Sequence, residues 1–336
     1  MMLSRTADHL FWMARYVERA ENTARMLDVN LQNSLLPQDS AAAEDGWRAM
    51  LGISELQAPY FARHDRIDRP SVLDFMVRDP SNPSSIYSCL RAARENARAV
   101  RGTLTTELWE SYNTTWLEWH NMVGTGGLRL QRDPSELFEW VKFRSHVSRG
   151  VMIGTMLKDE AFYFARLGTF LERADNTARI LDVKYHGLAE LGRLYEAPEA
   201  SGDNPGGPDP LDDDDQQRHF YHWAAVLRSV SAFEIYRKVY RDAITPMRVA
   251  ELMILRPDMP RSLVNCMAEV TYNLTQVAND SSTETERRAG RLHAELNFGR
   301  IDDILHSGLH AWLTNFLERV NDLGVRISRD FLVWAQ

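Results

Sequence analysis

The segment Glu18-Arg-Ala-Glu-Asn-Thr-Ala-Arg-Met-Leu-Asp-Val29 occurs twice in this chain, the second time as Glu172-Arg-Ala-Asp-Asn-Thr-Ala-Arg-Ile-Leu-Asp-Val183. Ten of the twelve positions are identical, and the two exceptions exchange Glu for Asp and Met for Ile. The same order of apolar and polar residues, repeated 154 residues later, indicates an internal duplication. We therefore expect the chain to contain two related structural units.

The apolar residues around each copy follow the period of an α-helix. In the first copy they step by three and four residues, through Leu10, Met13, Val17, Ala20, Ala24, Leu27 and Leu31. The second copy repeats this stripe at Phe164, Leu167, Leu171, Ala174, Ala178, Leu181 and Tyr185. No segment shows the alternating pattern of a strand, so the sequence predicts an all-α fold with a long first helix in each half.

A second internal match follows each long helix. Residues 72–77 and the Pro-x-x-Pro turn at 80–83 resemble residues 249–254 and the turn at 257–260, with an offset of 177. We infer two halves, 1–157 and 158–336, that form one compact multi-helix bundle about a pseudo-two-fold axis. The change in offset, 177 − 154 = 23 residues, predicts an insertion, which we place at 196–215 because this stretch is rich in Pro, Gly and Asp.

Helix boundaries are predicted from the same periodicity and from Pro and Gly positions. The expected helices are 4–34, 44–57, 70–79, 84–101, 103–121, 134–156, 158–192, 212–243, 246–255, 260–279, 283–297 and 300–333.

Both long helices carry the same polar stripe on a face predicted to lie opposite the apolar one. Glu18, Asn22 and Arg25 share that face, and the second copy repeats them as Glu172, Asn176 and Arg179. Arg19, Thr23 and Asp28, repeated as Arg173, Thr177 and Asp182, add further polar positions nearby, and we include them in the stripe. Adjacent helical residues point roughly 100° apart, so Glu18 and Arg19 need partners elsewhere. Three interpretations are open: a solvated face, a buried network of Arg–carboxylate pairs, or a ligand or partner site built from both copies.

Four arginines form a ladder that is present in one half only, at Arg91, Arg94, Arg98 and Arg101. The second half has Ala or Thr at the corresponding positions. Guanidinium groups on one helix face suit carboxylate or phosphate recognition, so the ladder is a candidate anion-binding surface. The alternative is that these arginines are solvated or pair with the surplus of acids.

Composition narrows the possible functions. Of 39 basic residues only four are Lys, and the 47 acids give a net charge of −8, which argues against a general nucleic-acid binder. No run approaches the about 18 apolar residues of a membrane span. Two cysteines suit a reducing cytoplasm, and Cys89 and Cys266 are expected to be small core residues. No metal-ligand, phosphate-loop or nucleophile motif is present, so no cofactor or metal is expected.

The doubled motif resembles the signature of the bacterial alpha-E domain family, an all-α family of unknown function named for its Glu-Arg pair. Further resemblance lies in Arg94-Glu-Asn-Ala-Arg98, Glu107-x-Trp109-Glu110, Gly308-Leu-His310 and Ile327-Ser328. The signature falls on Glu18-Arg19 and Glu172-Arg173, whereas the later Glu318-Arg319 lacks the Asn-Thr-Ala-Arg continuation.

The resemblance implies which proteins are encoded nearby, but it implies no particular reaction. Such proteins are typically encoded beside, or fused to, a circularly permuted ATP-grasp ligase and a transglutaminase-like cysteine peptidase. Our leading hypothesis is a non-catalytic helical partner subunit that binds this ligase or an anionic peptide substrate. In one alternative the chain is an enzyme, with Glu18 and Glu172 as acid/base groups and the arginines holding an anionic intermediate. In a second it is a structural homo-oligomer scaffold; the sequence predicts no oligomeric state.

Overall fold

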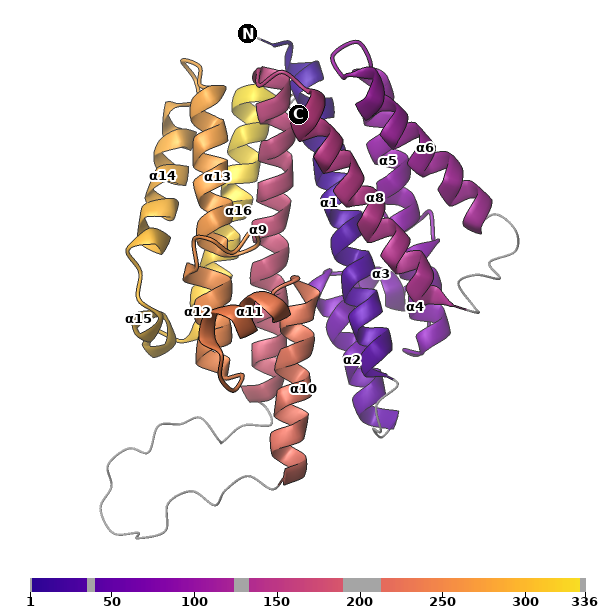
Figure 1. Ribbon diagram of the computed structural model, residues 1–336, viewed down its shortest axis with the longest axis vertical. Coiled ribbons are helices and arrows are strands. Elements are labelled where there is room, and N and C mark those ends of the chain that lie inside the picture. Colours follow the sequence, from indigo (N-terminus) through magenta and orange to yellow (C-terminus); the bar gives the residue numbers. More distant parts are fainter. Residues whose placement is uncertain (1, 35–39, 124–132, 190–212, 333–336) are drawn as a thin grey trace.

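The computed structural model describes residues 2–34, 40–123, 133–189 and 213–332, and Figure 1 shows their arrangement. These residues form fifteen helices and no strand, which confirms the predicted all-α class. The helices are α1 (Ser4–Asn33), α2 (Ser40–Ile53), α3 (Gln57–Phe61), α4 (Arg69–Val77), α5 (Ile86–Ala99), α6 (Thr106–Val123), α8 (Pro134–Thr155), α9 (Glu160–Ala189), α10 (Asp213–Ser229), α11 (Phe233–Tyr240), α12 (Pro246–Leu255), α13 (Leu263–Gln276), α14 (Thr283–Asn297), α15 (Ile301–His306) and α16 (Leu309–Phe331).

The two long helices that carry the repeated motif, α1 and α9, pack against each other in the middle of the molecule (Figure 1). They run in the same direction, since Phe11 meets Gly168 near one end and Glu18 meets Arg173 further along. A Cβ atom on Gly168 would lie 2.1 Å from the Phe11 carbonyl oxygen, so only glycine allows this close approach. One cluster of buried apolar side chains includes residues of both helices.

The two halves of the chain surround this central pair in the same way. Helices α5 and α8 pack against α1 on one side, and α13 and α16 pack against α9 on the other (Figure 1). Ser85 and Ser262 end the two Pro-x-x-Pro turns and accept hydrogen bonds from the backbone N–H groups of Ser88 and Asn265, which caps α5 and α13 alike. The shared ancestry of the halves stays a prediction.

Two predicted helices are each broken in the structure. The helix expected over 212–243 is divided into α10 and α11 because Ser231 adopts a left-handed backbone conformation, with φ of 56°. The helix expected over 300–333 is divided into α15 and α16 at Gly308, whose φ is 87°. The predicted insertion at 196–215 lies outside the described residues except for its last three, which begin α10 instead of continuing a loop.

Two smaller predictions concern the core and the membrane. Cys89 and Cys266 are fully buried, as expected for small core residues, and burial raises the pKa of each thiol to about 12. Among the described helices, none combines the length and the apolar character that a bilayer crossing requires.

Candidate functional site

The repeated Glu-Arg pairs form crossed ion pairs between α1 and α9. Arg19 donates from Nε and Nη2 to the two carboxylate oxygens of Glu172, at 2.6 and 3.1 Å. Arg173 binds Glu18 in the same bidentate way, with both distances at 2.9 Å. Because the helices are parallel and in register, the glutamate of each motif pairs with the arginine of the other motif.

The polar stripe is buried rather than solvated. Glu18 is 1% exposed and Glu172 is 5% exposed. Burial of this face is possible because α1 has neighbouring helices on both of its faces. A solvated stripe is excluded for these two carboxylates, whereas a buried network is what the contacts describe.

The network is larger on the Glu18 side. Arg261 donates to Glu18 and to Glu21, in both cases at 2.6 Å. Arg149 lies 2.8 Å from Glu18 and 2.5 Å from Glu21, and Arg25 adds a 2.7 Å contact to Glu21. Two buried carboxylates are thus compensated by several guanidinium groups from three other segments of the chain.

These contacts keep the buried carboxylates ionised. Burial by itself would raise the pKa of Glu18, but Arg173, Arg261 and Arg149 lower it to about 2. Burial likewise opposes ionisation of Glu172, and Arg15 and Arg19 lower its pKa to about 2. At neutral pH neither group holds a proton that it could donate to a substrate.

Other stripe residues make equivalent contacts in the two copies of the repeat. Arg25 binds Glu21 and Arg179 binds Asp175, each one helical turn away. Near the ends of the repeat, two acids contact side chains of the flanking helices: Asp28 pairs with Lys142 at 2.8 Å, and Asp182 lies 2.6 Å from the His310 ring.

Two further stripe residues, Asn22 and Thr177, contact Arg261. Asn22 accepts a hydrogen bond from the Arg261 side chain, and the Thr177 hydroxyl donates to the Arg261 carbonyl. The buried Asn22 Nδ2 has no hydrogen-bond partner among the described residues. A buried amide donor without a partner is costly, which favours a polar guest beside it.

A polar pocket opens beside Glu172, between α1 and α9, and we call it the α1–α9 pocket. Its volume is about 270 Å³. Three cations and three carboxylates line it, together with amides and hydroxyls from both repeats: Arg15, Arg19, Arg179, Glu55, Glu172, Asp175, Asn22, Thr23, Ser84, Asn176 and Asn321. Six of the twelve stripe residues that the sequence singled out line this pocket, namely Arg19, Asn22, Thr23, Glu172, Asn176 and Arg179, and the other six lie elsewhere.

The pocket is open on this side because a small residue stands where the other half has an arginine. Ser84 and Arg261 follow the second proline of their Pro-x-x-Pro turns, at corresponding positions. Arg261 occupies the space beside Glu18 and Glu21, to each of which it donates a hydrogen bond at 2.6 Å. Ser84 is too short to reach Glu172 in this way, so the space remains available to a ligand.

The arginine ladder does not join this site. Arg94 donates to Asn113 at 3.0 Å and pairs with Glu95, which also binds Arg98 at 2.6 Å. Arg91 and Arg98 are exposed. The helix predicted over 84–101 ends at Ala99, so Arg101 lies beyond α5 and contacts the ring of Trp109 instead of extending the ladder.

Sequence reasoning missed several members of the network, among them the buried acid Glu21 and the arginines Arg15, Arg149 and Arg261. Arg15 lies one turn before Arg19 and binds Glu172 at 2.8 Å. Arg149 and Arg261 are 131 and 243 residues from Glu18 in the sequence, so no local spacing connects them. One signal was available for Arg261, since the two Pro-x-x-Pro turns differ by serine and arginine at the same position.

Acid should destabilise the protein through this network. The folded-state pKa of Glu172, about 2, is below the ordinary value of 4.5, so its contribution is complete above about pH 4.5 and is lost as the pH falls toward 2. The shift corresponds to on the order of 3 kcal/mol. Urea unfolding of the wild type and of Glu172→Gln at several pH values should show a smaller loss of stability in the variant over this window. Parallel pH profiles would contradict the assignment.

This chain matches one protein-family model and is similar to three distant relatives. The model of the Alpha-E family, described as a predicted alpha-helical domain with a conserved ER motif, matches residues 2–332. Uncharacterised proteins of Mycobacterium bovis and of two Mycobacterium tuberculosis strains are 24% identical over 343 residues, which covers 94% of this chain. The chain spans only 35% of the length of these relatives.

No solved structure matches the chain. The family match covers nearly the whole sequence, and the family's Glu-Arg motif occurs here at the two positions that form the crossed ion pairs. The chain therefore belongs to the Alpha-E family.

Proposed function

We propose that this protein is a non-catalytic helical subunit of an ATP-grasp-type amide ligase system, and that its α1–α9 pocket holds an amino acid or the end of a peptide. The observation that carries the proposal is that the repeated carboxylates are ionised and bound by arginines. Glu172, which lines the pocket, is bound by arginines and ionised, so it is suited to hold a charged ligand in place but poorly suited to exchange protons with it. Glu18 is ionised in the same way but lies outside the pocket.

The charge balance of the pocket indicates the chemical class of the ligand. Arg15, Arg19 and Arg179 offer guanidinium groups for a carboxylate, while Glu55 and Asp175 offer partners for an ammonium group. With as many acids as bases on its wall, the pocket favours a zwitterion over a polyanion. Pockets for drug-sized ligands measure about 300–1,000 Å³. A volume of about 270 Å³ therefore suits a smaller guest.

Two observations support a partner protein. The mycobacterial relatives are nearly three times as long as the region that matches, so there the same kind of domain is part of a larger chain. The family resemblance implies a circularly permuted ATP-grasp ligase as that partner, with a transglutaminase-like peptidase as another candidate. In this scheme the ligase forms the amide bond, and this chain presents the amino acid or peptide.

Association with the ligase can be tested directly. We expect the protein and an ATP-grasp ligase from the same genome to elute together in size-exclusion chromatography at micromolar concentration. Replacing the exposed ladder residues, Arg91→Ala with Arg98→Ala, should weaken the complex if they contact acidic groups of the ligase. Arg63→Ala with Arg66→Ala is the matched control, since these arginines are also exposed. Separate elution of the two proteins would contradict the proposal.

A further inference from the structure

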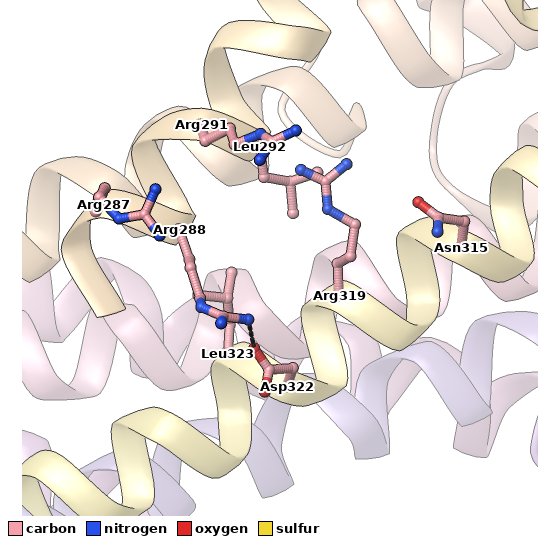
Figure 2. A pocket seen from close by; sticks show the side chains of 8 residues that line it. All are labelled: Arg287, Arg288, Arg291, Leu292, Asn315, Arg319, Asp322 and Leu323. Carbon is pink, nitrogen blue, oxygen red and sulfur yellow. Dashed lines mark hydrogen bonds and ion pairs between the residues drawn. The ribbon is translucent and has the colours of Figure 1, made fainter. Parts of the chain in front are cut away.

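A second cavity lies far from the repeated motif in sequence, between α14 and α16, and Figure 2 shows its lining. Its volume is about 350 Å³. Arg319 extends from α16 toward Arg291 and Leu292 of α14, while Arg287 and Arg288 approach from the next turn of α14. We call this cavity the basic groove.

The basic groove has more cations than the local carboxylates neutralise. In the described part of the chain, five arginines share three acids, through the pairs Arg287–Glu284, Arg288–Glu284, Arg288–Asp322, Arg326–Asp322, Arg291–Glu295 and Arg319–Glu295. Arg291 and Arg319 each donate one hydrogen bond to Glu295 there, although a guanidinium carries five N–H donors. This local excess of positive charge occurs on a chain whose net charge is −8.

An apolar pocket of about 200 Å³ continues the basic groove. The two share Leu292, Asn315 and Arg319 on their walls. The second pocket adds the apolar side chains of Leu296, Ile304, Trp312 and Phe316, and its rim also includes Glu295, Gly299, Arg300 and Asp303. Trp312 stacks on Phe316 with ring centroids 5.8 Å apart, so an aromatic surface lies next to the arginines.

We propose that the basic groove binds an acidic peptide segment of a partner, with carboxylates on the arginines and an apolar side chain in the adjoining pocket. Arg287 and Arg291 are one helical turn apart, about 6 Å along the axis. Alternate side chains of an extended peptide are about 6.6 Å apart, so acids at every second residue match this spacing. This inference depends on the groove alone and does not require the α1–α9 pocket to bind anything.

The charge pattern favours a peptide over a polyphosphate. Glu284, Glu295 and Asp322 lie between the arginines and would repel a dense cluster of phosphate charges. Single carboxylates spaced along a peptide can approach the guanidinium groups between them. One of these arginines already binds a carboxylate bidentately, since Arg287 donates to Glu284 at 2.8 Å from both Nε and Nη2.

The test uses fluorescence anisotropy with a labelled synthetic peptide that alternates Glu and Ala and ends in Leu. We expect binding at low salt that weakens as salt is added, and about tenfold weaker binding by the double variant Arg291→Gln with Arg319→Gln. Arg63→Gln is the matched control, because Arg63 is also exposed and ion-paired but lies in the first half of the chain. Thermal unfolding of each variant shows whether the fold is intact.

Three results would overturn the proposal. The first is an absence of peptide binding to folded wild-type protein at low salt. The second is an equal loss of affinity in Arg63→Gln, which would mean that the peptide responds to general charge and not to the groove. The third is displacement of the peptide by inorganic pyrophosphate at lower concentration than by unlabelled peptide, which would make a polyphosphate the better ligand.

Discussion

Replacing Arg261 by leucine should destabilise the protein by about 3–5 kcal/mol, the typical result of removing one partner from a buried ion pair. Arg261 is 6% exposed and is shared by Glu18 and Glu21. Without it, Arg149 and Arg173 remain, but two carboxylates lose a common guanidinium and Asn22 loses its donor. Urea unfolding at neutral pH measures the change in the free energy of unfolding.

The matched control is Arg288→Leu. Arg288 also bridges two carboxylates, Glu284 and Asp322, but its side chain is 44% exposed. Exposed pairs contribute about 0–1 kcal/mol, so this variant should lose little stability. A loss below 1 kcal/mol in Arg261→Leu, or equal losses in the two variants, would show that the buried network does not hold the central helices together.

The second large effect is expected from Ser84→Arg, which should fill the α1–α9 pocket and abolish ligand binding there. An arginine at this position has the same set of acceptors as Arg261 has in the other half. Glu172, Asp175 and Asn176 correspond to Glu18, Glu21 and Asn22 in the repeat. The new guanidinium would therefore occupy the ligand's place while it pairs with groups already lining the pocket.

The fold should survive this substitution, because Ser84 is only partly buried and borders open space. Ser81→Arg is the matched control, since it introduces the same side chain three residues away at an exposed position. Both variants should unfold within about 1 kcal/mol of the wild type, as measured with urea. A large loss of stability in Ser84→Arg alone would mean that the space beside Glu172 does not accept a guanidinium.

The central helices were predicted well from the sequence because the residue spacing that defines each helix lies within that helix. Stripes with helical spacing defined α1 and α9, and proline and serine residues marked the turns before α5 and α13. The geometry of a single helix was also enough to show that Glu18 and Arg19 point apart and do not bind one another. Their actual partners, Arg173 and Glu172, follow from the repeat once two parallel helices lie in register.

What the sequence did not predict depends on contacts between distant segments. The choice of the buried network among the three interpretations of the polar stripe required knowing that helices cover both faces of α1. The periodicity of one helix does not show whether its polar face is covered by other helices, because a buried face of ion pairs and a solvated polar face have the same residue pattern. The breaks at Ser231 and Gly308 were missed for a related reason: one φ angle ends a helix, while the apolar period continues across it.

We propose that the repeated Glu-Arg pairs build a scaffold that leaves a polar pocket for a small zwitterionic ligand. Isothermal titration of the wild type, Ser84→Arg and Ser81→Arg with a panel of free amino acids and simple dipeptides tests this proposal. We predict that at least one of these compounds binds the wild type and Ser81→Arg but not Ser84→Arg. Binding to Ser84→Arg with the wild-type affinity, or no binding of any compound to the wild type, would contradict the claim.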